Sequence, residues 1–215
     1  MLTQIKTDLK QQFENIYKEL SVTRFKSEPS YLQELRADAM DSFRQNGFPS
    51  TKNEEWKYTN IIPYFKKTNY AYDNNLQLSN GKSLKEFQYY GKDLDAYKIY
   101  LMDGLIDYEK SDLPENADIE IKPIMDCLDK EQVKDMLTQK RDYEKNPFLA
   151  LNTALFAKGV YIEIGKNVIL DKPIHLVHMY NSYKDTFVQS KNCFYVRNGS
   201  QAEIIESVNT FEENS

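Results

Sequence analysis

The residues of this chain with the strongest chemical character form one short cluster, Glu54-Glu55-Trp56-Lys57-Tyr58. Paired carboxylates beside an aromatic ring are typical of enzymes that process sugars. Adjacent residues seldom converge on one substrate atom, however, so the favoured interpretation is an ordered loop with Trp56 buried against the pair of helices expected at the N-terminus. A polysaccharide-active enzyme stays open as an alternative, and it requires Glu54 and Glu55 to face an open groove.

The histidines and cysteines do not form a metal-binding pattern. His175 and His178 are three residues apart in an expected strand, where they would point to opposite faces, so we interpret both as structural. Cys127 and Cys193 have no CxxC spacing, and a lone cysteine on a strand is more often a small buried hydrophobe. The sequence therefore predicts no catalytic residues, and no metal or cofactor bound by this chain.

No nucleotide-binding motif is present either. Gly81-Lys82-Ser83 resembles the end of a phosphate-binding loop, but that motif needs a glycine five residues earlier, where the chain has Leu76. The GxSxG and HExxH motifs are also absent. We therefore expect no ATP site in this chain.

Two amphipathic helices are predicted near the N-terminus. The first has an apolar stripe at helical spacing, formed by Leu2, Ile5, Leu9, Phe13, Ile16 and Leu20. The second has Ser30 as its expected cap, ends at Gly47, and has a stripe formed by Leu32, Leu35, Ala39 and Phe43. We expect the helices to pack as an antiparallel pair. An interaction module that binds a partner through the first stripe is a further alternative.

The middle of the chain has the pattern of a small mixed α+β region. Asp103-Gly104 is typical of a tight hairpin between strands at 96–102 and 105–108. Another strand begins at Ile119 and ends at Pro123, and a helix is predicted over 128–140.

The spacing of apolar residues changes from helical to strand-like within residues 146–180. Asn146 and Pro147 predict the start of a short helix. From Gly159 onwards the apolar residues alternate, in short segments at 160–164, 168–170, 174–177, 187–196 and 202–208. Three-residue corners separate the first of these, as a wound, solenoid-like sheet needs. We expect further turns or another chain to cover its open end.

The fold class predicted is therefore α+β, in three parts: 1–68, helical with the Glu54–Tyr58 loop; 69–145, mixed α+β; and 146–215, a helix that leads into the wound sheet. The net charge of −5 argues against nucleic acid or an anionic membrane as partner. The N-terminal residues have no apolar core of a signal peptide, and the cysteine usage fits a reducing compartment. We expect a cytoplasmic protein.

Two blocks of the sequence resemble the SufD family, subunits of the bacterial SUF iron-sulfur cluster assembly machinery. The first is similar to a signature near the start of that family and comprises Gly47, Pro49, Glu54, Glu55, Trp56, Lys57 and Tyr58. The second is similar to the segment that leads the family into its β-helix and includes Asn152, Thr153 and His175. The resemblance covers nearly all of the chain, and about the first half of a complete family member.

This resemblance implies a helical N-terminal region followed by the start of a right-handed parallel β-helix. It also implies a non-enzymatic scaffold subunit that pairs with a SufB-like paralogue and a SufC-like ATPase, which supplies ATP hydrolysis. The iron-sulfur cluster would be held only in the full assembly. The family's partner-binding and cluster-forming residues correspond to positions beyond Ser215, so none of them is carried over to this chain.

Overall fold

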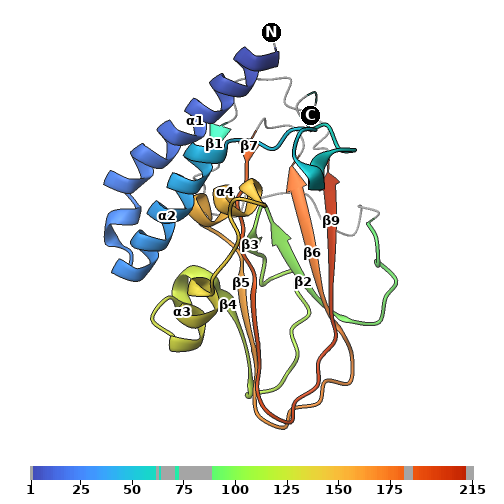
Figure 1. Cartoon of the computed structure of the whole chain (residues 1–215). Helices are drawn as coiled ribbons and strands as arrows, with labels where there is room; N and C mark the ends of the chain where they lie inside the picture. The colour runs from blue at the N-terminus through green and yellow to red at the C-terminus, as the bar shows by residue number, and fades with distance from the viewer. Residues whose placement is uncertain (1, 62, 64–70, 73–88, 182–185, 212–215) are drawn as a thin grey trace. The chain divides into compact units, whose positions relative to one another are not determined.

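The computed structural model describes residues 2–61, 63, 71–72, 89–181 and 186–211. The chain forms two compact units, which we describe separately (Figure 1). Unit 1 comprises Met1–Tyr72 and Asp129–Phe156, and unit 2 comprises Asp73–Leu128 and Ala157–Ser215. The expected mixture of helices and sheets is confirmed. The three-part division at residues 68 and 145 stays a prediction.

Unit 1 is built from four α-helices: α1 (Leu2–Val22), α2 (Ser30–Asn46), α3 (Glu131–Thr138) and α4 (Pro147–Leu155). It also contains the 3-10 turns η1 (Phe25–Ser27) and η2 (Glu54–Trp56) and the two-residue strand β1 (Ala71–Tyr72). The helices α1 and α2 lie side by side and run antiparallel, as predicted (Figure 1).

The described part of the apolar stripe of α1 belongs to the core rather than to a free surface. Leu9 and Phe13 have no exposed area. The alternative of a partner-binding stripe on this helix is therefore wrong. The predicted cap of α2 is wrong by one residue, because Pro29 occupies the cap position and makes no side-chain hydrogen bond there.

An aromatic cluster connects the end of α2 to α4. Gly47 adopts a φ of 63°, which glycine permits at little cost, and its N–H donates to the Phe43 carbonyl oxygen to close the helix. The next residue, Phe48, meets the rings of Phe13, Phe43 and Phe148 at centroid distances of 5.8, 5.2 and 5.9 Å. Such edge-to-face contacts add to the energy of burial, so the turn after α2 is fixed in place.

Arg36 of α2 is a fully buried charge. Its guanidinium forms two hydrogen bonds with the Glu28 carboxylate, Nε to Oε2 at 2.7 Å and Nη2 to Oε1 at 2.9 Å. It also donates to the carbonyl oxygens of Thr153 and Ala154, at 3.4 and 3.2 Å, in the last turn of α4. The last carbonyl groups of a helix have no partner within the helix, so Arg36 acts as the cap of α4.

The predicted start of α4 matches the structure, whereas the predicted bounds of α3 do not. The Asn146 side chain accepts a hydrogen bond from the Leu149 N–H at 3.0 Å, which confirms the predicted start of α4. The helix α3 is shorter than the predicted 128–140, because Lys130 and Gln139 have extended backbone at its two ends.

Unit 2 contains two sheets. In one sheet the strand order is β3 (Leu105–Ile106), β2 (Tyr97–Met102), β6 (Ile174–Asn181) and β9 (Ile204–Phe211). In the other the order is β4 (Ile119–Pro123), β5 (Val160–Ile164) and β8 (Cys193–Val196). The unit also contains β7 (Thr186–Phe187) and the 3-10 helix η5 (Ile124–Cys127).

The predicted hairpin between β2 and β3 is confirmed. Asp103 and Gly104 have φ angles of 47° and 85°, and Met102 pairs with Leu105. Positive φ at both central residues is typical of the tight turn that suits twisted strands. The predicted strand that ends at Pro123 is also confirmed, as β4.

Two of the later strands of unit 2, β8 and β9, pair in parallel with β5 and β6 at similar offsets, whereas β6 pairs in parallel with the more distant β2, Ile174 with Tyr97. Tyr161 of β5 pairs with Cys193 of β8, 32 positions on, and Ile174 of β6 pairs with Ile204 of β9, 30 positions on. A single bridge between Ile169 and Gln201 has an offset of 32, and it is what remains of the strand expected at 168–170. The segments are thus stacked rather than folded into hairpins.

The corners that follow β5 and β8 are also stacked. Asn167 and Gly199 occupy equivalent positions, 32 residues apart, and both have positive φ, 62° and 74°. The Asn167 N–H donates to the Asn198 carbonyl oxygen at 3.1 Å. The same backbone turn therefore recurs in both segments. The β-helix itself stays a prediction.

One apolar core lies between the two sheets, and it draws its residues from β2, β3, β5, β6 and the corner after β5. Its buried members are Ile99, Leu101, Ile106, Val160, Ile162, Ile164, Val168, Ile174 and Leu176.

The predicted alternation along β5 is correct, but both of its faces are buried. On the face away from this core, Tyr161 donates to Glu163 at 2.6 Å, and the Arg197 Nε donates to the same carboxylate at 2.5 Å. A buried carboxylate needs such partners, because an unpaired one would be costly.

Replacing Arg36 should strongly destabilise unit 1. We expect Arg36→Met to lower the free energy of unfolding by about 3–5 kcal/mol, because it leaves the Glu28 carboxylate buried without its cation and removes two hydrogen bonds to the end of α4. Urea unfolding followed by circular dichroism measures the loss. The matched control is Arg44→Ala, which removes an exposed pair with Asp41 and should cost less than about 1 kcal/mol. Equal losses for both variants would contradict the role given to Arg36.

A methyl group at Gly159 should disrupt the stacked segments. Gly159 has a φ of 121°, and a Cβ there would overlap the Lys191 carbonyl oxygen of the next segment. We expect Gly159→Ala to lower the free energy of unfolding by at least about 2 kcal/mol. Gly199→Ala is the control, because its φ is also positive but the group it meets is the movable Asn167 side chain. A smaller loss for Gly159→Ala than for Gly199→Ala would contradict this prediction, because it would mean that the backbone around Lys191 shifts easily to admit the methyl group.

Candidate functional site

The Glu54–Tyr58 cluster lies on the surface of unit 1. Glu54 and Glu55 are exposed on η2, and Tyr58 is 91% exposed with the Lys57 Nζ 5.5 Å from its ring centroid. Trp56 is half-buried, and its ring centroid is 5.5 Å from that of Phe148 on α4. The interpretation of a Trp56 buried against the pair of N-terminal helices is therefore not borne out: the ring is only partly buried, and its ring contact is with α4.

The other predicted family residues that lie in unit 1 have structural roles. Thr153 is fully buried, and its carbonyl oxygen is one of the two that Arg36 caps. The Asn152 carbonyl oxygen accepts from the Phe156 N–H at 2.8 Å and closes the last turn of α4. Gly47 and Pro49 flank Phe48, the centre of the aromatic cluster. These residues shape the fold rather than present chemistry.

His175, the remaining predicted residue, is buried in unit 2. Its Nε2 lies 2.9 Å from the Ser207 Oγ of β9, and its Nδ1 has no hydrogen-bond partner in the described part of the chain. Burial, and secondarily the charge of Lys98 on β2, lower the pKa of the imidazole below its ordinary 6.5. His175 is therefore neutral in the folded protein at neutral pH.

His178 points to the opposite face of β6, as predicted, so the two histidines do not converge. Its Nε2 is 3.4 Å from the Asn192 Nδ2 and 3.8 Å from the Glu206 Oε1. Its Nδ1 also has no hydrogen-bond partner among the described residues. Both histidines are buried on opposite faces of β6, as a structural role would require. In each, however, the Nδ1 atom has no hydrogen-bond partner among the described residues.

Glu206, which is exposed, joins the buried His178 in a polar network at the surface of unit 2. The Asn192 Nδ2 donates to Glu206 at 2.8 Å, and the Asn192 Oδ1 accepts from the Val160 N–H at 3.1 Å. The amide thus connects β9 to β5. The interaction with His178, assisted by Asn192, lowers the pKa of Glu206 below its ordinary value.

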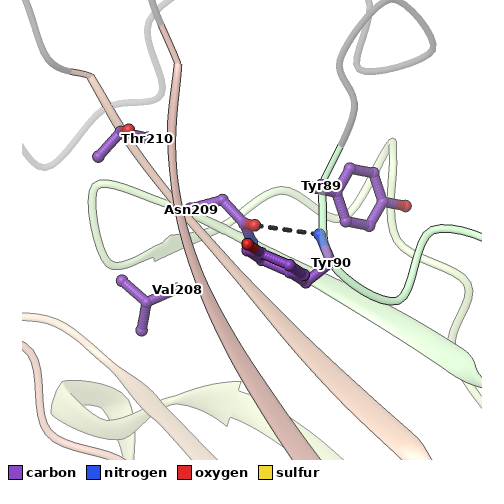
Figure 2. Close-up of a pocket in the computed structure, with 5 residues that line it drawn as sticks. All are labelled: Tyr89, Tyr90, Val208, Asn209 and Thr210. Atoms are coloured by element: carbon purple, nitrogen blue, oxygen red, sulfur yellow. Dashed lines mark hydrogen bonds between the residues drawn. The ribbon is translucent and has the colours of Figure 1, made fainter.

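A cavity of about 500 Å³ lies at β9 in the same unit, and its volume is within the range of small-molecule sites. Its lining residues are Tyr89, Tyr90, Val208, Asn209 and Thr210 (Figure 2). Asn209 is the fixed point of this wall: its Oδ1 accepts from the Tyr90 N–H at 3.3 Å, and its Nδ2 donates to the His178 carbonyl oxygen and the Ser207 Oγ. Neither Glu54 nor Glu55 lines this cavity.

The described residues contain no group of three or more histidine, cysteine, aspartate or glutamate side chains placed to hold a metal ion. Cys127 and Cys193 are both buried free thiols. The absence of a bound metal or cofactor in this chain stays a prediction.

Sequence reasoning did not identify Glu206, Asn209 or Tyr90. The alternation of residues 202–208 places Ser207 and Asn209 on one face of a strand and Glu206 on the other. This alternation does not show which strand lies beside residues 204–211, because their neighbour is β6, whose paired residues are 30 positions earlier in the sequence.

The comparison with protein families gives the class of this protein. Residues 7–176 match the model of the SufBD protein N-terminal region. The match covers most of the chain, and the chain belongs to the SufBD family, which indicates a role in iron-sulfur cluster assembly as part of a SUF complex. The predicted resemblance is thereby confirmed at the level of the family, although the match does not distinguish SufD from SufB.

A comparison with curated proteins found no match. Within the described residues, no helix is both long and apolar enough to cross a lipid bilayer.

Glu206 should make the stability of unit 2 depend on acidic pH. Its pKa is lower in the folded than in the unfolded chain, so its contribution is present above the unfolded value, about 4.5, and is lost as the pH falls through the folded pKa. We expect Glu206→Gln to be less stable than the wild type at pH 6, with the difference shrinking towards pH 3. Urea unfolding across this range measures it. Glu203→Gln, at an exposed position, is the control, and a constant difference for Glu206→Gln would contradict the assignment.

Proposed function

We propose that this chain is a SufD-type, non-enzymatic scaffold subunit in iron-sulfur cluster assembly. It acts in the cytoplasm with a SufB-like paralogue and a SufC-like ATPase, and it holds no cofactor by itself. The observation that carries the proposal is the family match over residues 7–176. The particular assignment to SufD rests on the two sequence blocks around Trp56 and Thr153.

The parallel stacking in unit 2 supports the proposal that this unit is the start of a right-handed parallel β-helix. Pairing of β5 with β8 and of β6 with β9 repeats at offsets of 32 and 30 residues, and the corner at Asn167 recurs at Gly199. Each added turn would bury the end of the one before it. Val208 of β9, which is 67% exposed, is an apolar side chain that a further turn would cover.

The distribution of charged groups favours a scaffold over an enzyme. Arg36 pairs with Glu28 inside unit 1, the buried Glu163 pairs with the exposed Arg197 in unit 2, and each pair connects two backbone segments. A polysaccharide-active enzyme would need Glu54 and Glu55 to converge on a groove, whereas both are exposed neighbours on one short 3-10 turn.

The test is recovery of the partners of the whole gene product, tagged at its own chromosomal locus. We expect a SufC-like ATPase and a SufB-like subunit to co-purify with it at constant ratio, identified by mass spectrometry. A cytosolic protein outside the family with the same tag is the control. Failure to recover any SUF subunit would falsify the proposal. Recovery of a SufD-like partner in place of a SufB-like one would show that this chain is the SufB-type subunit.

A further inference from the structure

A short turn, Tyr89 to Lys92, lies on the face of the β2–β6–β9 sheet opposite the apolar core, and we call it the strap. Both of its ends are tied to β2. The Tyr89 and Tyr100 hydroxyl groups are 2.5 Å apart, and the Lys98 Nζ donates to the Lys92 carbonyl oxygen at 2.6 Å. The Tyr89 ring also packs on Val177 and Met179 of β6. The strap therefore covers a small apolar patch of the sheet.

The middle of the strap contacts the other two strands. The Tyr90 N–H donates to Asn209 of β9, and the Gly91 backbone lies against the His175 ring of β6. A Cβ on Gly91 would be 2.6 Å from the His175 Cε1 and 3.2 Å from its Nδ1. Only glycine fits there, so the strap backbone itself closes over the nitrogen that lacks a partner.

This arrangement suits a neutral imidazole and opposes a charged one. His175 is fully buried, and an imidazolium would carry a proton on Nδ1 for which the described residues offer no acceptor. The groups beside it are Lys98, its register neighbour on β2, the Ser207 hydroxyl of β9, and the Gly91 backbone of the strap. Asn209 bonds to Ser207, and the Lys92 carbonyl oxygen accepts from Lys98. Lys98 is itself a cation, and it is the charge that acts on the ring.

We infer that the strap is an acid-released latch: protonation of His175 detaches residues 89–92 from the sheet. Detachment lets water reach the imidazolium and separates it from the strap backbone. Fewer contacts are lost in this way than by opening the apolar core on the other side of the sheet. The proton enters from solvent and remains on the ring, so no other reactant is needed.

The direction of the pH dependence follows from the lowered pKa of His175 in the closed state. Once the strap is detached, the ring is hydrated and titrates near 6.5. As the pH falls below about 6.5, the open state takes up a proton that the closed state excludes, so the closed state loses stability. The loss continues until the pH reaches the lowered pKa.

Opening changes two surfaces. The cavity loses one wall, because Tyr89 and Tyr90 belong to the strap whereas residues 208–210 belong to β9 (Figure 2). The patch at Val177 and Met179 loses the cover of Tyr89. The state of His175 thus decides whether the cavity exists and whether the patch is exposed.

The test is hydrogen exchange of the full chain by mass spectrometry at pH 7.5 and 5.5, corrected for the intrinsic pH dependence of exchange. We expect the protection of residues 89–95 to fall at pH 5.5 by up to about tenfold, which is the limit for a closed state that takes up no proton at this pH. Residues 160–164 of β5 are the internal reference and should keep their protection. Loss of protection in both segments together would mean general acid unfolding and would overturn the latch.

Three variants separate His175 from other titrating groups. His175→Gln removes the titration but keeps a hydrogen-bonding group for Ser207, so the strap should stay protected at both pH values. His178→Gln is the matched control and should keep the wild-type response. Gly91→Ala should release the strap at both pH values. An unchanged acid response in His175→Gln, or none in the wild type, would overturn the proposal.

Discussion

The buried ion pair of Arg36 and Glu28 is the interaction on which unit 1 depends. The Arg36 Cζ lies 4.0 and 4.4 Å from the ring centroids of Phe25 and Phe156, so aromatic faces enclose the guanidinium on the sides where it makes no hydrogen bonds. Burial lowers the pKa of this group, and pairing with Glu28 opposes that effect. Because one side chain joins η1, α2 and the end of α4, these elements have little freedom to move apart.

Unit 2 is held by a different constraint, the close stacking of one segment on the next. Gly159 lies directly against the Lys191 carbonyl group, and the corners at Asn167 and Gly199 repeat one backbone conformation. Polar groups along the stack, such as Asn192 with Glu206, then help to align adjacent segments. Unit 1 thus depends on one central charge, whereas unit 2 depends on a repeated contact.

Local elements could be predicted from the sequence, and partners distant in the sequence could not. The stripe through Leu9 and Phe13, the Asp103-Gly104 turn and the Asn146 cap are signals within a few residues, and each matches the structure. The capping of α4 by Arg36 joins residues 117 and 118 positions apart, and nothing near Arg36 indicates it. The strap over His175 could not be predicted either, because the need for glycine at position 91 comes from its contact with the His175 ring of β6, which is distant in the sequence.

The similar offsets of the β5–β8 and β6–β9 pairs, 32 and 30 residues, have a consequence for how such a protein changes over time. Each segment touches the one before it, so whole segments of about thirty residues can be duplicated or lost without altering those already in place. A change of one residue within a segment is far less tolerated, because it moves every inward side chain of the following strand to the outer face. Variation in length should therefore come in full turns or in loops outside the ladder.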